Sequence, residues 1–286
     1  MLVPTGSTRL AAVIGSPVRH SLSPLLHNTA FESLGLDWVY VALDVAPGAA
    51  PDALAAMRTL GIAGFSVTMP HKEAVAEGCD DITADAAALR AVNCVVNDGG
   101  RLVGHNTDGD GFVAALAAEL DLRPTGLRCV VLGAGGAARS IGLALARHGA
   151  AQVAIVNRTI ERAEDAAALF PEVALVVRPD AVAGVISDCD LIVNATSVGM
   201  GAQIGAEGLD AVPFDTSLIA PHHTVVDIVY RPLLTPLLVQ AQERGARTAN
   251  GVSMLIHQAA IAFTLWTGHE APVATMTSAV STLLVD

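Results

Sequence analysis

Residues 129–139 read Cys-Val-Val-Leu-Gly-Ala-Gly-Gly-Ala-Ala-Arg: a short apolar run, a glycine-rich turn and the start of an alanine-rich stretch. The run predicts a buried strand and the stretch a helix, which is the context that the pattern G-x-G-x-x-A requires. Gly133 permits the tight turn, Gly135 lets the backbone approach a pyrophosphate, and Ala138 allows close helix–sheet packing. Free N–H groups at the helix N-terminus favour an anion. We therefore expect a dinucleotide site; the alternative is a plain tight turn.

The end of the next predicted strand indicates which dinucleotide is bound. Residues 156–162 read Val-Asn-Arg-Thr-Ile-Glu-Arg, without the carboxylate that an NAD site usually places at the strand end. Arg158 and Arg162 are one helical turn apart, and two guanidinium groups suit a 2′-phosphate. The pattern therefore favours NADP. In the alternative interpretation, Arg162 pairs with Glu161 or Asp165 on the helix surface.

Strands and helices alternate on both sides of this turn and predict an α/β fold. In the second half, near-continuous apolar strands imply a parallel sheet covered on both faces. We expect its strands at 129–132, 153–156, 174–177, 191–194 and 225–229, and its helices at 137–148, 160–170 and 236–244.

The first half continues the alternation, with one hairpin. Asn97-Asp98-Gly99-Gly100 lies between two apolar runs and is a strong hairpin signal. Residues 122–126 break the pattern and mark a boundary. The strands expected here are 10–14, 39–43, 65–67, 91–96 and 101–103, and the helices are 24–33, 51–60 and 108–120, with a further helix at 254–266 in the tail.

Composition narrows the class of protein. The 286 residues suit two domains; 52% are hydrophobic and 15% charged, so a sizeable core is assured. A net charge of −12 argues against nucleic-acid binding and leaves small molecules as the expected partners. The four cysteines are far apart, without metal-site spacing, and indicate a reduced, cytoplasmic protein. No signal peptide or membrane span is evident.

The chain contains a single lysine, Lys72, among 16 basic residues. It follows the apolar Phe65-Ser66-Val67 run and the Met69-Pro70 turn, where a strand opens onto a helix. Such positions are a common place for chemistry in α/β folds. Arginine cannot lose its proton at accessible pH, whereas lysine can, which makes Lys72 a candidate for proton transfer. The alternative is that one lysine survived by chance.

Two polar segments add candidate ligands. Ser21 and Ser23 precede a helix and can both present hydroxyls to a ligand, although Ser23 before Pro24 also suits an ordinary N-cap. Asp108, in the run 104–111, can likewise cap the helix that follows it.

Taken together, these segments resemble the shikimate dehydrogenase (shikimate/quinate dehydrogenase) family over nearly the whole chain. Nine spaced motifs carry the resemblance, and they are far more specific together than any one alone. They are Ser-x-Ser-Pro at 21–24, Val-Thr-x-Pro-x-Lys at 67–72, Ala-Val-Asn at 91–93, Asn-Thr-Asp at 106–108, Gly-Ala-Gly-Gly-Ala at 133–137, Asn-Arg-Thr-x-x-Arg at 157–162, Asn-Ala-Thr-Ser-x-Gly-Met at 194–200, Asp-x-x-Tyr-x-Pro at 227–232 and Met-Leu-x-x-Gln at 254–258.

The resemblance implies a substrate-binding domain at 1–107 plus 252–286 and a Rossmann-type NADP domain at 108–251, with the active site in a cleft between them. It implies that Lys72 and Asp108 form the catalytic pair and that no metal takes part. The implied substrate contacts are Ser21, Ser23, Ser66, Thr68, Lys72, Asn93, Asp108, Tyr230 and Gln258. The implied NADP contacts are Gly133, Ala134, Gly135, Gly136, Ala137, Ala138, Asn157, Arg158, Thr159, Arg162, Ile228 and Gly251.

The implied activity is the NADP-dependent, reversible reduction of 3-dehydroshikimate to shikimate by a monomer or homodimer. Ser66 stands where the family usually has asparagine, and it offers one hydroxyl in place of an amide. The other departures are Arg90 for glycine, Cys94 for threonine and Asn250 for aspartate. The alternatives are a quinate or substituted-shikimate dehydrogenase, a non-catalytic NADP- or shikimate-sensing protein on the same fold, and a different NADP-linked reductase.

Overall fold

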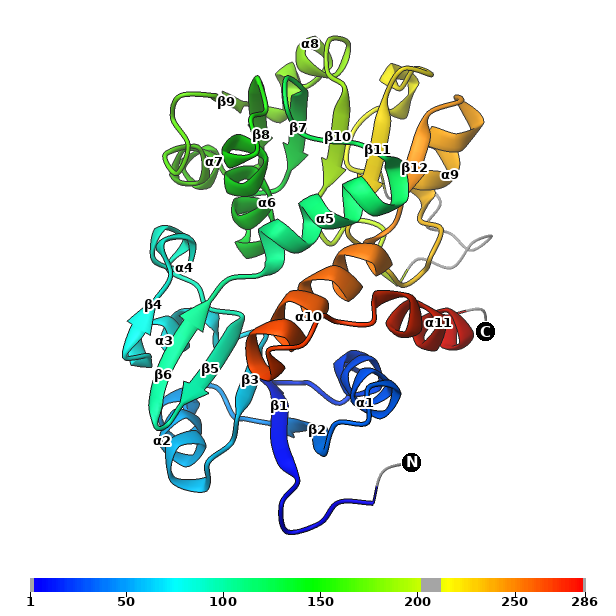
Figure 1. Ribbon diagram of the computed structural model, residues 1–286. Coiled ribbons are helices and arrows are strands. Elements are labelled where there is room, and N and C mark those ends of the chain that lie inside the picture. Colours follow the sequence, from blue (N-terminus) through cyan, green and yellow to red (C-terminus); the bar gives the residue numbers. More distant parts are fainter. Residues whose placement is uncertain (1–2, 202–211, 285–286) are drawn as a thin grey trace. The chain divides into compact units, whose positions relative to one another are not determined.

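The computed structural model describes residues 3–201 and 212–284. Internal contacts divide the chain into two compact units, Met1–Thr107 with Ile256–Asp286, and Asp108–Leu255. The break in the sequence pattern at 122–126 lies inside the second unit, because the helix before it, α5 (Asp108–Leu120), belongs to that unit. Figure 1 shows both units, each with its own sheet.

The first unit holds a mixed six-stranded sheet with the order β2-β1-β3-β5-β6-β4. β1 pairs in parallel with β2 and β3, whereas β5 runs antiparallel to β3 and β6, and β4 pairs in parallel with β6. The predicted hairpin is confirmed: Asp98 pairs with Arg101, and Gly99 and Gly100 between them both have positive φ. The bounds are β1 Arg9–Gly15, β2 Trp38–Asp44, β3 Gly64–Val67, β4 Asp81–Ile82, β5 Cys94–Asp98 and β6 Arg101–His105.

The two faces of this sheet carry different cores. Ala12, Ile14, Phe65 and Val67 lie in an aliphatic cluster with residues of α2. On the opposite face, Tyr40 of β2 stacks on His27 of α1, and a Cβ on Gly64 of β3 would meet Trp266 of α10. α1 also packs against α11, and Figure 1 shows these two helices side by side. The helices are α1 Ser23–Ser33, α2 Ala50–Leu60, α3 Lys72–Gly78, α4 Ala84–Leu89, α10 Gly251–Thr267 and α11 Val273–Leu284.

The second unit is an all-parallel six-stranded sheet with the order β12-β11-β10-β7-β8-β9. The parallel sheet that the apolar runs predicted is therefore confirmed. Its order changes direction between β7 and β10, the kind of switch point at which open α/β sheets bind ligands. The elements are β7 Arg128–Leu132, α6 Gly136–Arg147, β8 Gln152–Val156, α7 Ile160–Ala167, β9 Ala174–Val177, α8 Ala183–Ile186, β10 Leu191–Asn194, β11 Thr224–Asp227, α9 Pro236–Glu243 and β12 Arg247–Ala249.

Several expected elements differ from the structure in their bounds; for example, the helix expected from 254 begins at Gly251. The strand expected at 91–96 begins only at Cys94, because α4 ends in a left-handed residue, Arg90 (φ 52°), and the chain must turn before it can pair. The strand expected to reach residue 229 ends at Asp227, and the helix expected to reach residue 170 ends at Ala167. The left-handed conformation at Arg90 gives a physical reason for the glycine that the family usually has there.

Candidate active site

The glycine turn of the second unit has the geometry of a phosphate cradle. Gly133 has φ 110°, and its N–H donates to the Val156 carbonyl at 2.8 Å. A Cβ on Gly133 would lie 3.0 Å from the Ala195 carbonyl oxygen. A side chain there would therefore be strained both by the positive φ and by this close contact. Gly135 and Gly136 are exposed, and a Cβ on either would meet nothing within 4 Å. The backbone at the start of α6 is therefore open to a ligand, and a pyrophosphate fits it.

The basic pair lies after β8. Arg158 and Arg162 are exposed, and neither forms an ion pair within the described part of the chain, so Arg162 is not engaged by Glu161 or Asp165. Asn157 plays a local part, since its amide donates to the Thr159 carbonyl at 2.8 Å and shapes the turn into α7. Two exposed guanidinium groups suit a 2′-phosphate, so the residues present fit NADP.

Gly251 starts α10 at a close approach that excludes any side chain. A Cβ there would lie 1.9 Å from the Ile228 carbonyl oxygen. The Gly251 N–H donates to the Val229 carbonyl at 3.1 Å. These contacts place the segment after β11, which carries Ile228 and the half-buried Tyr230, next to the start of α10.

A buried carboxylate, Asp227, organises the same segment. It is fully buried and accepts hydrogen bonds from the Asn194 amide at 3.0 Å, the Val229 N–H at 3.1 Å and the Thr235 hydroxyl at 2.7 Å. Burial raises the pKa of Asp227 above its ordinary value, and the three donors only partly oppose this. Because Asn194 ends β10 and Asp227 ends β11, the network connects the carboxyl ends of neighbouring strands. It was missed in the sequence, where Asn194 and Asp227 appear only as members of motifs.

In the first unit, Ser21 and Ser23 follow β1. α1 begins at Ser23 itself and Leu22 holds the capping position, so Ser23 is not the N-cap. Instead the Ser21 hydroxyl accepts the Ser23 N–H at 3.2 Å. A serine whose oxygen accepts keeps its own proton for donation. Ser21 is therefore arranged as a donor, as binding of a carboxylate requires.

Ser66, Thr68 and Lys72 lie at the end of β3 and the start of α3, all half-buried. The Thr68 N–H donates to the Ile14 carbonyl at 3.0 Å, which holds the ends of β1 and β3 together. The Lys72 carbonyl accepts the Val92 N–H at 2.9 Å, so the backbone of the lysine is tied to the segment that carries Asn93.

Asn93 is buried and engaged by a residue that sequence reasoning missed. Its amide nitrogen donates to the Thr107 hydroxyl at 3.0 Å, and its oxygen accepts the Thr107 N–H at 2.8 Å. Thr107 also donates its hydroxyl to the Gln258 carbonyl at 3.1 Å. Thr107 thus fixes two of the predicted substrate contacts through one side chain. Its place in the Asn-Thr-Asp motif was the available signal.

The first unit therefore holds seven of the nine predicted substrate contacts, most of them where β1 and β3 end and where α1 and α3 begin. These are Ser21, Ser23, Ser66, Thr68, Lys72, Asn93 and Gln258. Asp108 and Tyr230 belong to the second unit, with Asp108 buried as the first residue of α5. The pairing of Lys72 with Asp108 would join the two units and stays a prediction.

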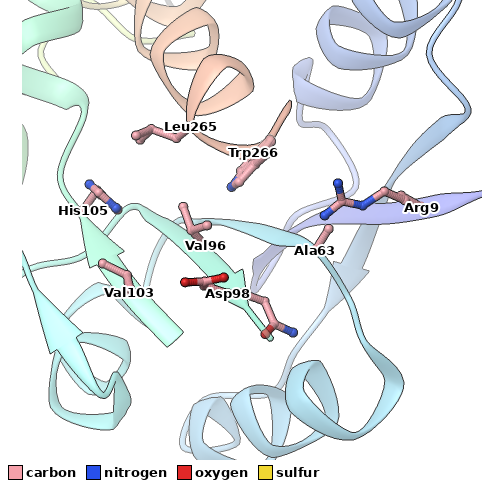
Figure 2. Close-up of a pocket in the computed structure, with 9 residues that line it drawn as sticks. Arg9, Ala63, Val96, Asp98, Val103, His105, Leu265 and Trp266 are labelled. Atoms are coloured by element: carbon pink, nitrogen blue, oxygen red, sulfur yellow. The ribbon is translucent and has the colours of Figure 1, made fainter. Parts of the chain in front are cut away.

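A separate depression lies elsewhere on the first unit (Figure 2). Its volume is about 360 Å³, and none of the predicted site residues lines it. Burial lowers the pKa of His105 on its wall, and the Arg9 guanidinium, which also borders it, lies 4.2 Å from the Trp38 ring centroid. The mixed charges of Arg9, Asp98 and His105 do not define one ligand class.

The described residues include neither a metal-binding group nor a reactive thiol. Within 3–201 and 212–284, no three His, Cys, Asp or Glu side chains are grouped to hold a metal ion. All four cysteines are free, and burial raises the pKa of Cys129 and of Cys189 to about 12. These thiols are therefore poor nucleophiles. No helix in the described ranges is both long and apolar enough to cross a bilayer.

One unit of the chain has a strand, a glycine turn and a helix with a basic pair nearby. The other unit carries hydroxyl, amide and ammonium groups. Together they define a nicotinamide-dependent dehydrogenase of the two-domain α/β type. Family models narrow the class. The shikimate dehydrogenase substrate-binding domain matches residues 13–95, shikimate/quinate 5-dehydrogenase matches 116–228, and the shikimate 5'-dehydrogenase C-terminal domain matches 251–280. The chain belongs to the shikimate dehydrogenase family.

Individual relatives agree with this assignment. Shikimate dehydrogenase (NADP(+)) of Geobacter metallireducens is 46% identical over 275 residues, covering 94% of each chain. Shikimate 5-dehydrogenase of Thermus thermophilus, solved with NADP(H) and shikimate, is 38% identical, with a TM-score of 0.86 over 96% of this chain and 99% of that one. Quinate dehydrogenase of Corynebacterium glutamicum, solved with NAD, is 33% identical, with a TM-score of 0.87 over 96% and 99%.

Proposed function

We propose that this protein catalyses the NADP-dependent, reversible reduction of 3-dehydroshikimate to shikimate, a step of aromatic amino-acid biosynthesis. The observation that carries the proposal is the set of seven polar side chains in the first unit, most of them where β1 and β3 end and α1 and α3 begin. Ring substrates with several hydroxyls and a carboxylate need several hydrogen-bond donors and acceptors, and this group supplies serine and threonine hydroxyls, two amides and one ammonium.

The two units take different roles in this proposal. Residues 1–107 and 252–286 form the substrate domain, and residues 108–251 form the NADP domain. The cradle at the start of α6 receives the pyrophosphate, and Arg158 and Arg162 receive the 2′-phosphate. Ile228, whose carbonyl closely approaches Gly251, is a further predicted contact of the cofactor.

NADPH, when bound, supplies the hydride for the C3 ketone. The residues of this chain handle the proton and the developing charge. Lys72 stabilises the oxygen as it becomes an alkoxide and donates a proton to it, and in the reverse direction it accepts one. Asp108 holds the ammonium in place.

The remaining contacts fix the ring. Ser21, which accepts the Ser23 N–H and keeps its own proton, donates to the substrate carboxylate. The Tyr230 hydroxyl is a further hydrogen-bond donor to this carboxylate. Thr68, Asn93 and Gln258 bind the ring hydroxyls.

Quinate is the second candidate substrate. Ser66 in place of the usual asparagine enlarges that part of the pocket, and a quinate dehydrogenase shares the fold at 33% identity. Against it, that relative was solved with NAD, whereas Arg158 and Arg162 suit NADP. We place the protein in the cytoplasm as a monomer or homodimer.

The proposal is tested by incubating the protein with NADPH and 3-dehydroshikimate and identifying the product by chromatography. We expect shikimate to form in step with NADPH consumption, and Lys72→Ala to abolish most of the turnover. An intact, folded protein that leaves 3-dehydroshikimate unchanged would overturn the proposal.

A further inference from the structure

Tyr40 is the largest fully buried side chain in the first unit's aromatic core, and its hydroxyl has no hydrogen-bond partner among the described residues. The residue is 1% exposed, and within the described chain no atom forms a hydrogen bond with its phenolic oxygen. A buried hydroxyl without a partner costs about 1–3 kcal/mol, so its retention in place of phenylalanine calls for an explanation.

The ring is held firmly by α1. The Asn28 side chain clamps the backbone of Tyr40, donating to its carbonyl and accepting its N–H, each at 2.8 Å. His27 stacks on the Tyr40 ring at 4.4 Å between centroids, with 22° between the planes. The hydroxyl position is therefore determined by packing.

The strand register places Tyr40 on the same face of the sheet as Ser66. Ala11 of β1 pairs with Tyr40 on one side and with Gly64 on the other, and two residues on, Val13 pairs with Ser66. Paired residues and residues two apart share a face. The small side chains in this row leave room for the Tyr40 ring to extend toward β3.

Ser66 and Ser23 carry the hydroxyls that interact with the Tyr40 phenol, although neither meets the distance and angle of a hydrogen bond in the structure. Burial raises the pKa of Tyr40, and the nearby side chains of Ser66 and Ser23 oppose that shift. The phenol therefore keeps its proton at any assay pH and is a permanent donor. Both serines are among the predicted substrate contacts, and Ser66 is one of the positions at which this chain departs from the usual family residue.

We propose that Tyr40 is a positioning residue that donates its phenolic hydrogen to the Ser66 hydroxyl when substrate is bound, so that Ser66 donates its own hydrogen to a substrate oxygen. This inference rests on the proposed function. Ser21 shows the same arrangement already formed, with its oxygen occupied by the Ser23 N–H. A serine can rotate to donate or accept, and an asparagine offers both groups at once. Because Tyr40 donates to the Ser66 oxygen, Ser66 is left to donate its own hydrogen to the substrate.

The test is a double-mutant cycle of Tyr40→Phe and Ser66→Ala, with steady-state kinetics of shikimate oxidation and thermal unfolding measured on each variant. Tyr40→Phe is expected to raise the KM for shikimate about three- to tenfold, the size of one hydrogen bond. The KM for NADP⁺ should stay unchanged. In the Ser66→Ala background, the same change should have almost no further effect.

Stability separates this role from a structural one. Because the hydroxyl is unpartnered in the described chain, its removal should leave the unfolding temperature equal or higher. An unchanged shikimate KM in Tyr40→Phe, or an equal effect with and without Ser66, would overturn the proposal. Absence of shikimate turnover in the unaltered protein would instead overturn the proposed function, and the cycle would then be repeated on shikimate binding by calorimetry.

Discussion

Lys72 is the residue on which the proposed chemistry depends, because it offers the one lysine ammonium group in the chain. Lys72→Arg keeps the charge but removes the option of proton transfer, and Lys72→Ala removes both. Both variants should lower kcat about 100-fold or more. The KM for shikimate should change much less, since the interaction is made mainly in the transition state. Near-normal kcat with a raised KM in Lys72→Ala would show that the lysine only binds substrate.

Arg158 is the residue that tests the choice of cofactor. It is exposed after β8 and has no ion pair within the described chain, so its guanidinium is available to a phosphate. Arg158→Ala should raise the KM for NADP⁺ about tenfold or more and leave that for NAD⁺ nearly unchanged. Arg178→Ala, which breaks an exposed pair with Asp180 in the same unit, is the matched control and should do neither. An equal rise for both cofactors would contradict the assignment.

At the scale of elements, the contact between β3 and α10 is a tightly packed point of the first unit. A Cβ on Gly64 would lie 2.4 Å from Trp266 Nε1, which itself donates to the Val95 carbonyl at 3.0 Å. Gly64→Ala should therefore lower the free energy of unfolding by about 1–3 kcal/mol. Gly184→Ala in α8, where a Cβ meets nothing within 4 Å, is the control and should be neutral or stabilising. Equal chemical-denaturation curves for the two variants would refute this.

The loops after β10 and β11 give a pH-dependent prediction. Because the pKa of Asp227 is raised in the folded protein, the native state binds its proton more tightly than the unfolded state. The contribution of Asp227 to stability is therefore present at low pH and is lost as pH rises from its ordinary pKa of 3.8 through the raised value. Asp227→Asn lacks this titration. The stability of the unaltered protein relative to Asp227→Asn should thus fall as the pH rises above about 4.

Urea unfolding of both proteins at several pH values measures this difference. Parallel pH profiles would show that Asp227 does not titrate in that window. A relative stability that rises with pH would mean that the three hydrogen bonds outweigh burial and that the shift has the opposite sign.

At the scale of the whole molecule, sequence patterns predicted what long apolar runs and fixed motifs encode. The glycine turn at 133–138 and the hairpin at 97–100 were found because their backbone conformations demand particular residues. Short elements and elements rich in polar residues were not predicted. β12 has three residues, Arg247–Ala249, and its pairing with β11 is what makes it a strand. α11 is rich in threonine, serine and valine, which have weak helix propensity, and its packing against α1 supplies the missing stability.

The residues of the candidate site likewise divide into those that motifs predicted and those that they did not. Side chains in contiguous motifs, such as Ser21 and Lys72, were identifiable from their neighbours. The roles of Thr107, which lies in the Asn-Thr-Asp motif, and of Tyr40 were not, since they arise from contacts with residues far away in sequence. Thr107 reaches Asn93 and the Gln258 carbonyl, and Tyr40 lies beside Ser66. No local pattern records such contacts.

The central claim is that this protein is an NADP-dependent dehydrogenase of shikimate, and one assay tests it most directly. NADP⁺ reduction is followed with shikimate and with quinate in parallel, under identical conditions. The account predicts a kcat/KM for shikimate at least about tenfold above that for quinate, a difference of about 1.4 kcal/mol. The extra hydroxyl and saturated ring of quinate crowd the end of the site near Ser21 and Ser23. Comparable or faster turnover of quinate would contradict the claim and show that Ser66 has reshaped the pocket.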